Sequence, residues 1–149
     1  MSFLEAAIAA IIGSAVTALA VALKATLAGR ALIANGDLIK KAFDLIDPVL
    51  DNVGDYLKIL NKSKLELVKV IDTHIHADHV TGASKLKDKT KCATIMGENT
   101  PANSVEIKVK DEEIINLDDL KIRALYTPGH TSDSYCFIMD NYLFSGDTL

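Results

Sequence analysis

Three histidines and one aspartate lie within six consecutive positions, directly after an apolar run. These side chains are His74, His76, Asp78 and His79. Imidazole nitrogens and carboxylate oxygens are common ligands of zinc and iron. The preceding run, residues 65–71, is rich in Leu, Val and Ile and is expected to form a buried strand. Because a loop at a strand end is held by a rigid scaffold yet stays open to substrate, the pattern predicts a metal site.

Two later loops carry further groups able to bind a metal. His130 lies in the loop 127–131, where proline and glycine favour a tight turn. Asp147 follows a third apolar run and a glycine. All four histidines of the chain fall in the first two loops, an arrangement that random placement would seldom produce. We therefore expect the three loops to contribute to one metal site.

Composition and charge exclude several classes of protein. The 149 residues are 49% hydrophobic and 24% charged, which is ordinary for a globular domain. A net charge of −4 offers no basic surface, so we expect no nucleic-acid partner. The two cysteines, Cys92 and Cys136, have neither zinc-finger nor disulfide-framework spacing. A reducing compartment, the cytoplasm, is therefore the simplest prediction.

The first 44 residues differ in character from the rest of the chain. Residues 6–23 are 18 consecutive uncharged residues, long enough as a helix to contact or span a membrane. Eight of the 18 are alanine, and the larger side chains recur every three or four positions, as in a helix packed against a partner. Three interpretations stay open: a packed helix, a cleaved signal, and a membrane anchor. In the last case the following basic residues would place the domain on the cytoplasmic side.

The remaining elements are predicted from periodicity and turn residues. Asp37 is expected to cap a short helix through Phe43, which places a boundary between an apolar helical segment, 1–44, and a domain, 45–149. The domain is expected to contain helices from 53 and from 81. It is also expected to contain strands at 65–71, 93–96, 105–109, 113–115, 120–126, 135–139 and 142–144. This mixture predicts an α/β fold of packed layers.

The ligand pattern resembles that of a known family. His74-Ile75-His76-Ala77-Asp78-His79 is similar to the H-x-H-x-D-H signature of the metallo-β-lactamase superfamily. His130 and Asp147 match its two later ligand motifs, and the resemblance covers about residues 45–149. It implies a partial αββα sandwich that is truncated at the C-terminus. It also implies that Asp47 supports the metal loop from a strand end, and Thr131 is a further expected supporting position.

Three stretches, 46–50, 76–83 and 129–134, resemble the persulfide dioxygenase branch, whereas glyoxalase II tends to carry two glycines after the motif. The resemblance then implies one Fe(II) per chain. Its ligands would be His74, His130 and Asp147, with His76, Asp78 and His79 around them. The implied reaction is the oxidation of glutathione persulfide by O₂ to sulfite.

Two alternatives stay open. If His76, Asp78 and His79 helped to bind a second metal bridged by Asp147, two zinc ions per chain would hydrolyse a thioester, as in glyoxalase II. The other alternative is an inactive fragment or interaction module that keeps the loops without a function. In every case a truncated domain is expected to leave a sheet face for the apolar helix, or for a second copy in a homo-oligomer, to cover.

Overall fold

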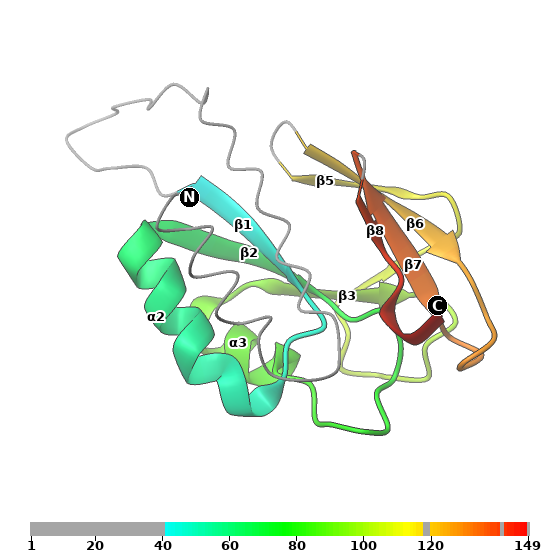
Figure 1. Ribbon diagram of the computed structural model, residues 1–149, viewed down its shortest axis with the longest axis horizontal. Coiled ribbons are helices and arrows are strands. Elements are labelled where there is room, and N and C mark those ends of the chain that lie inside the picture. The colour runs from blue at the N-terminus through cyan, green and yellow to red at the C-terminus, as the bar shows by residue number, and fades with distance from the viewer. Residues whose placement is uncertain (1–40, 118–119, 141, 149) are drawn as a thin grey trace.

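The computed structural model describes residues 41–117, 120–140 and 142–148 (Figure 1). The uncharged run 6–23, and with it the three interpretations of the N-terminal segment, lies outside the described residues. In the part that is described, no helix is both long enough and apolar enough to cross a membrane.

The elements alternate between helix and strand in the first half of the domain and are almost all strands in the second. In chain order they are β1 (Lys41–Ile46), η1 (Leu50–Asn52), α2 (Val53–Ser63), β2 (Leu65–Ile71), α3 (Ala83–Thr90), β3 (Ala93–Gly97), β4 (Ile107–Val109), β5 (Ile114–Leu117), β6 (Leu120–Tyr126), β7 (Tyr135–Met139), β8 (Tyr142–Phe144) and η2 (Gly146–Thr148). The predicted α/β fold of packed layers is confirmed.

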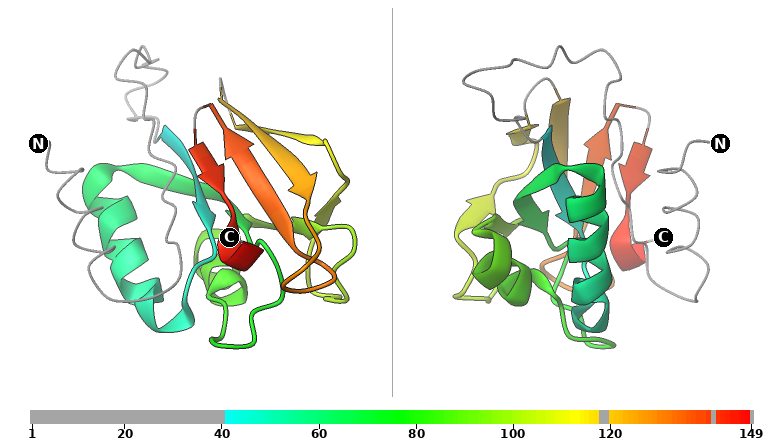
Figure 2. Two further views of the ribbon diagram at one scale, coloured as in Figure 1. Left: turned by 45° about the vertical axis from the view of Figure 1, so that its right-hand side comes forward. Right: turned by 90° about the vertical axis from the view of Figure 1, so that its left-hand side faces the viewer.

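The first sheet is parallel and carries α2 and α3 on one face (Figures 1 and 2). Its strand order is β1-β2-β3-β4. The apolar residues of α2 recur at helical spacing, so Val53, Tyr56 and Leu60 share one buried stripe. This stripe and Leu86 of α3 pack on the sheet, where they form a core with Leu67 and its neighbours. The helices therefore hold one face of the sheet away from water.

The second sheet is antiparallel, with the order β5-β6-β7-β8, and its last two strands form the predicted hairpin. Apolar side chains of both sheets make a second core, in which Ile71 and Ile95 lie with Ile122, Phe137 and Met139. All five are buried. The two sheets therefore face each other across this core, with the helices outside the first sheet, as the left view of Figure 2 shows.

One predicted element is wrong. The helix expected through Phe43 is replaced there by β1, which pairs in parallel with β2 from Lys41 onward. A short apolar run fits a helix and a buried strand equally well, and here the pairing with β2 decides the outcome. The boundary placed between 44 and 45 consequently falls inside a strand of the sheet.

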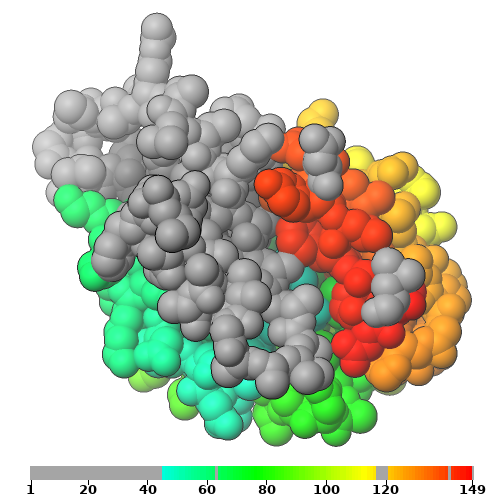
Figure 3. Space-filling model, viewed as in Figure 1, coloured from blue at the N-terminus to red at the C-terminus, as the bar shows by residue number. Residues whose placement is uncertain are grey.

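Three loops meet at one end of the sheets (Figure 2, left view). They follow β2, β6 and β8 and are coloured green, orange and red. On the face shown in Figure 3, the red atoms after β8 border orange and green atoms of the other two loops. The fold therefore brings together the three loops that carry the predicted ligands.

Candidate metal centre

The histidine loop after β2 is anchored by a carboxylate from the neighbouring strand. Asp47 follows β1 in the left-handed backbone region, with φ of 49°. Its Oδ1 accepts a hydrogen bond of 2.7 Å from the Thr73 amide, and its Oδ2 accepts one of 2.8 Å from the Thr73 hydroxyl. Both residues are buried. Asp47 is thus bonded to the residue that precedes His74.

Each of the three imidazoles in this loop has one nitrogen bonded to an oxygen. Nδ1 of His74 lies 2.8 Å from Oγ1 of Thr73. Nε2 of His76 lies 3.2 Å from Oδ1 of Asp47, and Nδ1 of His79 lies 3.1 Å from Oδ1 of Asp78. Because the Thr73 hydroxyl gives its hydrogen to Asp47, it accepts one from His74, which leaves a lone pair on Nε2 of His74.

The opposite nitrogen of each ring is buried and has no hydrogen-bond partner among the described residues. These atoms are Nε2 of His74, Nδ1 of His76 and Nε2 of His79. Leaving a buried polar atom without a partner costs free energy, and metal-bound histidines characteristically donate their other nitrogen to an oxygen, as these rings do. The donor set therefore fits a metal.

His74, His130 and Asp147 form the first group of donors. Their nearest ligand atoms all lie within 4.8 Å of one another. Oδ2 of Asp147 is 3.6 Å from Nε2 of His130 and 4.0 Å from Nε2 of His74. The His74 side chain is 1% exposed, whereas those of His130 and Asp147 are 43% and 32% exposed. One side of the group is thus sealed and the other is open to solvent.

The second group lies beside the first. Ligand atoms of His76, Asp78 and His79 also fall within 4.8 Å of one another. The His76 ring centroid is 4.3 Å from that of His74 and 4.2 Å from that of His79. The sequence prediction named all six of these donors, and the structure brings them together as two adjacent groups.

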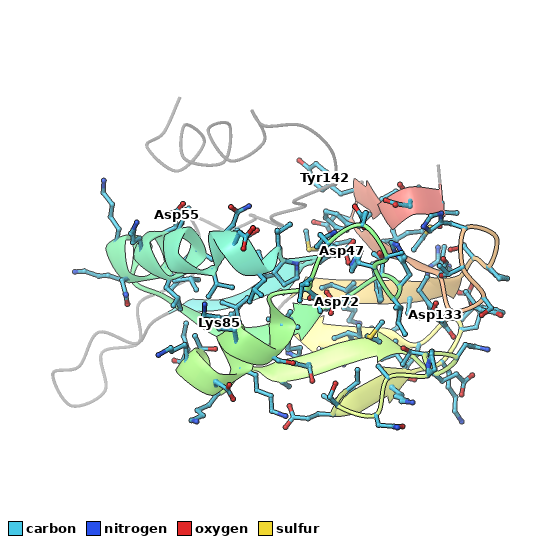
Figure 4. The ribbon with its side chains drawn as sticks, turned by 90° about the horizontal axis from the view of Figure 1, so that it is seen from below. Asp47, Asp55, Asp72, Lys85, Asp133 and Tyr142 are labelled. Atoms are coloured by element: carbon cyan, nitrogen blue, oxygen red, sulfur yellow. The ribbon has the colours of Figure 1, made fainter. Side chains whose placement is uncertain are left out.

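A third combination, Asp47 with Asp72 and His76, meets the same distance criterion. Here the carboxylates already have partners. Both oxygens of Asp47 bond Thr73, and both oxygens of Asp72 accept from the Thr81 hydroxyl, at 2.9 and 3.0 Å. Figure 4 shows Asp47 and Asp72 close together. We therefore interpret these two residues as supports.

The crowding of ionisable groups shifts their pKa values. Burial, followed by the negative charge of Asp47, raises the pKa of Asp72 to about 7. Burial alone would lower the pKa of His76, but the hydrogen bond to Asp47 and the nearby carboxylate charges raise it. Burial and the neighbouring His76 lower the pKa of His74. A lowered pKa keeps His74 neutral, the form in which an imidazole binds metal.

Gly146 allows the Asp147 loop to approach the histidine loop. Its φ is +52°, and a Cβ at this position would overlap Oγ1 of Thr73. A side chain here would push Asp147 away from His74 or displace the Thr73 hydroxyl.

Thr131 shapes the turn that carries His130. Its amide donates to Oγ of Ser134 at 3.1 Å, its hydroxyl lies 2.7 Å from the same atom, and its carbonyl accepts from the Gly129 amide at 3.1 Å. Three further supporting residues, Asp72, Thr73 and Asp133, were not predicted. Asp72 and Thr73 directly precede His74, which could have drawn attention to them, whereas the sequence carries no signal for the role of Asp133.

Comparison with known proteins places the chain in a family. Residues 38–149 match the family model described as the metallo-beta-lactamase superfamily. The chain belongs to this superfamily. The match begins seven residues before the predicted domain boundary at 45, in agreement with the position of β1.

Curated relatives of this superfamily member include hydroxyacylglutathione hydrolases. The protein from Francisella tularensis subsp. novicida is 35% identical over 108 residues, which are 70% of this chain and 42% of the relative. The probable hydroxyacylglutathione hydrolase of Schizosaccharomyces pombe is 35% identical over 111 residues, 70% of this chain and 43% of the relative. The chain thus spans about two fifths of the length of these relatives.

Among solved structures, ETHE1 from Myxococcus xanthus shares 32% identity with a TM-score of 0.68, over 73% of this chain and 48% of that protein. A metallo-beta-lactamase from Staphylococcus aureus shares 26% identity with a TM-score of 0.58, over 68% of this chain and 35% of that protein. These relatives are consistent with the glyoxalase II and persulfide dioxygenase branch of the superfamily.

Proposed function

We propose that the chain carries the metal site of a persulfide dioxygenase-like enzyme that uses one non-haem iron. The observation that carries the proposal is the group formed by His74, His130 and Asp147, two imidazoles and one carboxylate from three different loops. This donor set is the facial triad of non-haem Fe(II) oxygenases. The likeness to ETHE1 and the sequence 76–83 support the same branch.

Iron held by His74, His130 and Asp147 would supply the redox chemistry between O₂ and a substrate sulfur. The protein contributes orientation: Thr73 and Asp47 fix the His74 ring, while His130 and Asp147 lie on the exposed side where a substrate can enter. In the overall reaction, glutathione persulfide, one O₂ and one water give glutathione, sulfite and two protons. The outer sulfur is oxidised and O₂ is reduced.

Oxygen consumption tests this proposal. The iron-loaded chain is expected to consume O₂ when glutathione persulfide is added, and His130→Ala is expected to abolish the reaction. Lys85→Ala, a change on the exposed side of α3, serves as the matched control and should leave the rate unchanged. Iron-loaded chain that consumes no O₂ with this substrate would contradict the dioxygenase proposal.

A second candidate is a hydrolase with two zinc ions that acts on a thioester of glutathione. Its specific support is the second donor group, in which Nδ1 of His76 and Nε2 of His79 are buried without partners in the described part of the chain. The names of the curated relatives point the same way. Two zinc ions held by these donors would supply a water of lowered pKa for attack on an acyl carbon.

Metal stoichiometry and product analysis separate the two candidates. The hydrolase requires two metal equivalents per chain by mass spectrometry and releases glutathione from an acyl thioester. His79→Ala should then abolish activity and remove one metal equivalent, whereas in the dioxygenase the single iron stays bound to His74, His130 and Asp147. A purified chain that retains no metal would favour an inactive fragment or interaction module.

A further inference from the structure

Asp133 links the loop of His130 to the loop of His74. It lies three positions after His130, its side chain is buried, and its Oδ2 accepts a hydrogen bond of 3.1 Å from the amide of Ile75. Figure 4 shows Asp133 apart from Asp47 and Asp72. The two carboxylates therefore hold the histidine loop at different residues, Asp47 at Thr73 and Asp133 at Ile75.

A second hydrogen bond joins the same two segments. The amide of Tyr135 donates to the carbonyl of Thr73 at 2.9 Å. The two bonds thus flank His74, one at the residue before it and one at the residue after it, and they end two positions apart, at 133 and 135. The Asp133 carboxylate takes the place that a backbone carbonyl occupies in a regular strand pair.

The partner segment is itself rigidly held. Tyr135 is fully buried, its hydroxyl donates to Oδ1 of Asn99 at 3.0 Å, and its ring lies directly over Gly97. The turn before it is closed by the bonds between Thr131 and Ser134. Asp133 therefore lies in a rigidly held turn, the same short turn that carries His130.

The histidine loop needs such a support. Between Thr73 and Thr81 it contains no helix or strand, and Ile75, Ala77, Asp78 and Val80 are exposed. Asp133 holds the Ile75 backbone from outside this loop. Without that bond, the loop would first contact the rest of the domain at His76, whose ring lies beside Asp47.

We propose that Asp133 is a positioning residue that sets the separation between His74 and His130, and thereby the metal affinity of the site. The inference rests on the proposed metal site, but it does not depend on which reaction the site performs. Hydrogen bonds that orient metal ligands typically contribute about 10- to 100-fold to affinity.

Zinc affinity, measured by competition with a chromophoric chelator, tests the proposal. Asp133→Ala is expected to weaken zinc binding by about 10- to 100-fold. Asp133→Asn keeps an oxygen that can accept from Ile75 and is expected to stay within about threefold of the wild type. Ser132→Ala, an exposed change on the same turn, is the matched control and should bind like the wild type.

Zinc binding by the wild type tests the metal site, and the difference between the wild type and the Asp133 variants tests the positioning role. Wild-type chain that binds no zinc would overturn the metal site itself. Wild-type binding together with equal binding by Asp133→Ala would overturn the positioning role alone, as would an Asn variant that loses as much as the Ala variant. If Asp133→Ala does not fold, Asp133→Ser removes the same acceptor while keeping a polar group, and its affinity decides the question.

Discussion

At the scale of single residues, Thr73 connects the supports of the site to a ligand. Its amide and hydroxyl both donate to Asp47, its hydroxyl also accepts from His74, and its carbonyl accepts from the amide of Tyr135. Gly146 packs against the same side chain. The orientation of the His74 ring thus depends on one hydroxyl group.

Removing that hydroxyl should weaken both the site and the fold. Thr73→Val keeps the shape of the side chain but leaves buried atoms of Asp47 and His74 without a partner. We expect a loss of about 1–3 kcal/mol in the free energy of unfolding of the metal-free chain and about 10- to 100-fold in zinc affinity. Thr73→Ser keeps the hydroxyl and serves as the control in urea unfolding and chelator competition. Equal affinity in the Val and Ser variants would contradict this role.

Asp72 should make the metal-free chain less stable as the pH rises. Its pKa is about 7 in the folded chain against the ordinary value of 3.8. Between these values the unfolded chain has lost this proton while the folded chain retains it, so folding is increasingly disfavoured as pH rises. Asp72→Asn cannot ionise and still accepts from Thr81.

Urea unfolding in the presence of a chelator, from about pH 4 to about pH 8, checks this expectation. The stability of Asp72→Asn relative to the wild type should increase up to about pH 7 and then level off, because above that pH both states of the wild type are ionised. A difference that is constant with pH would show that burial of Asp72 does not perturb its titration.

The donors could be predicted from sequence, but their supports only in part. Residue type and position after an apolar run are enough to indicate His74, His130 and Asp147 as candidate ligands. The family resemblance indicates Asp47 in addition. Asp133 is different, because accepting from Ile75 depends on where two distant loops lie in space. A lone aspartate in a turn has a local explanation, so its long-range bond leaves no pattern in the sequence.

At the scale of elements, strands were predicted best where they are long or bounded by clear turns. The bounds of β2, β6, β7 and β8 agree with the prediction. β4 is shorter than its alternating pattern suggested, beginning at Ile107. The helix predicted through Phe43 is wrong for the first half of β1, because only the pairing of this strand with β2, more than twenty residues later, distinguishes the two conformations.

Gly97 controls how closely β3 approaches β7. A Cβ at this position would overlap the Tyr135 ring, which is fully buried and cannot move aside. Gly97→Ala is therefore expected to destabilise the chain by about 1–3 kcal/mol. Gly54→Ala on helix α2 is the control: no atom lies within 4 Å of the position its Cβ would take, so it should be neutral or stabilise by up to about 1 kcal/mol. Equal melting temperatures for both variants would contradict this packing argument.

At the scale of the whole molecule, the mixture of helices and strands predicted packed layers. It did not predict which strands are neighbours within each sheet. In the described part of the chain, β1 to β4 form a parallel sheet and β5 to β8 an antiparallel one. Contacts across the core, such as Ile71 with its neighbours in the second sheet, join residues far apart in the chain. Neither periodicity nor turn residues encode which strands become neighbours. The packing of two sheets could therefore be expected only from the family resemblance.

Metal binding should stabilise the whole domain. A ligand that binds only the folded chain raises the free energy of unfolding by about 2.7 kcal/mol when its free concentration is about 100 times its Kd. This increase corresponds to a rise of several degrees in Tm. We expect zinc to raise the Tm of the chain and a chelator to reverse the change in a calorimetric scan. The variant carrying both His74→Ala and His130→Ala should show no such rise. A rise of equal size in that variant would place the bound metal elsewhere.

The convergence of three loops also has a kinetic consequence. His74 follows a strand of the first sheet, whereas His130 and Asp147 follow strands of the second, so the donors meet only after the sheets have docked. An interaction that forms late in folding leaves the folding rate almost unchanged and slows unfolding. Metal should therefore lengthen the lifetime of the folded chain, and with it the resistance to proteolysis that depends on global opening.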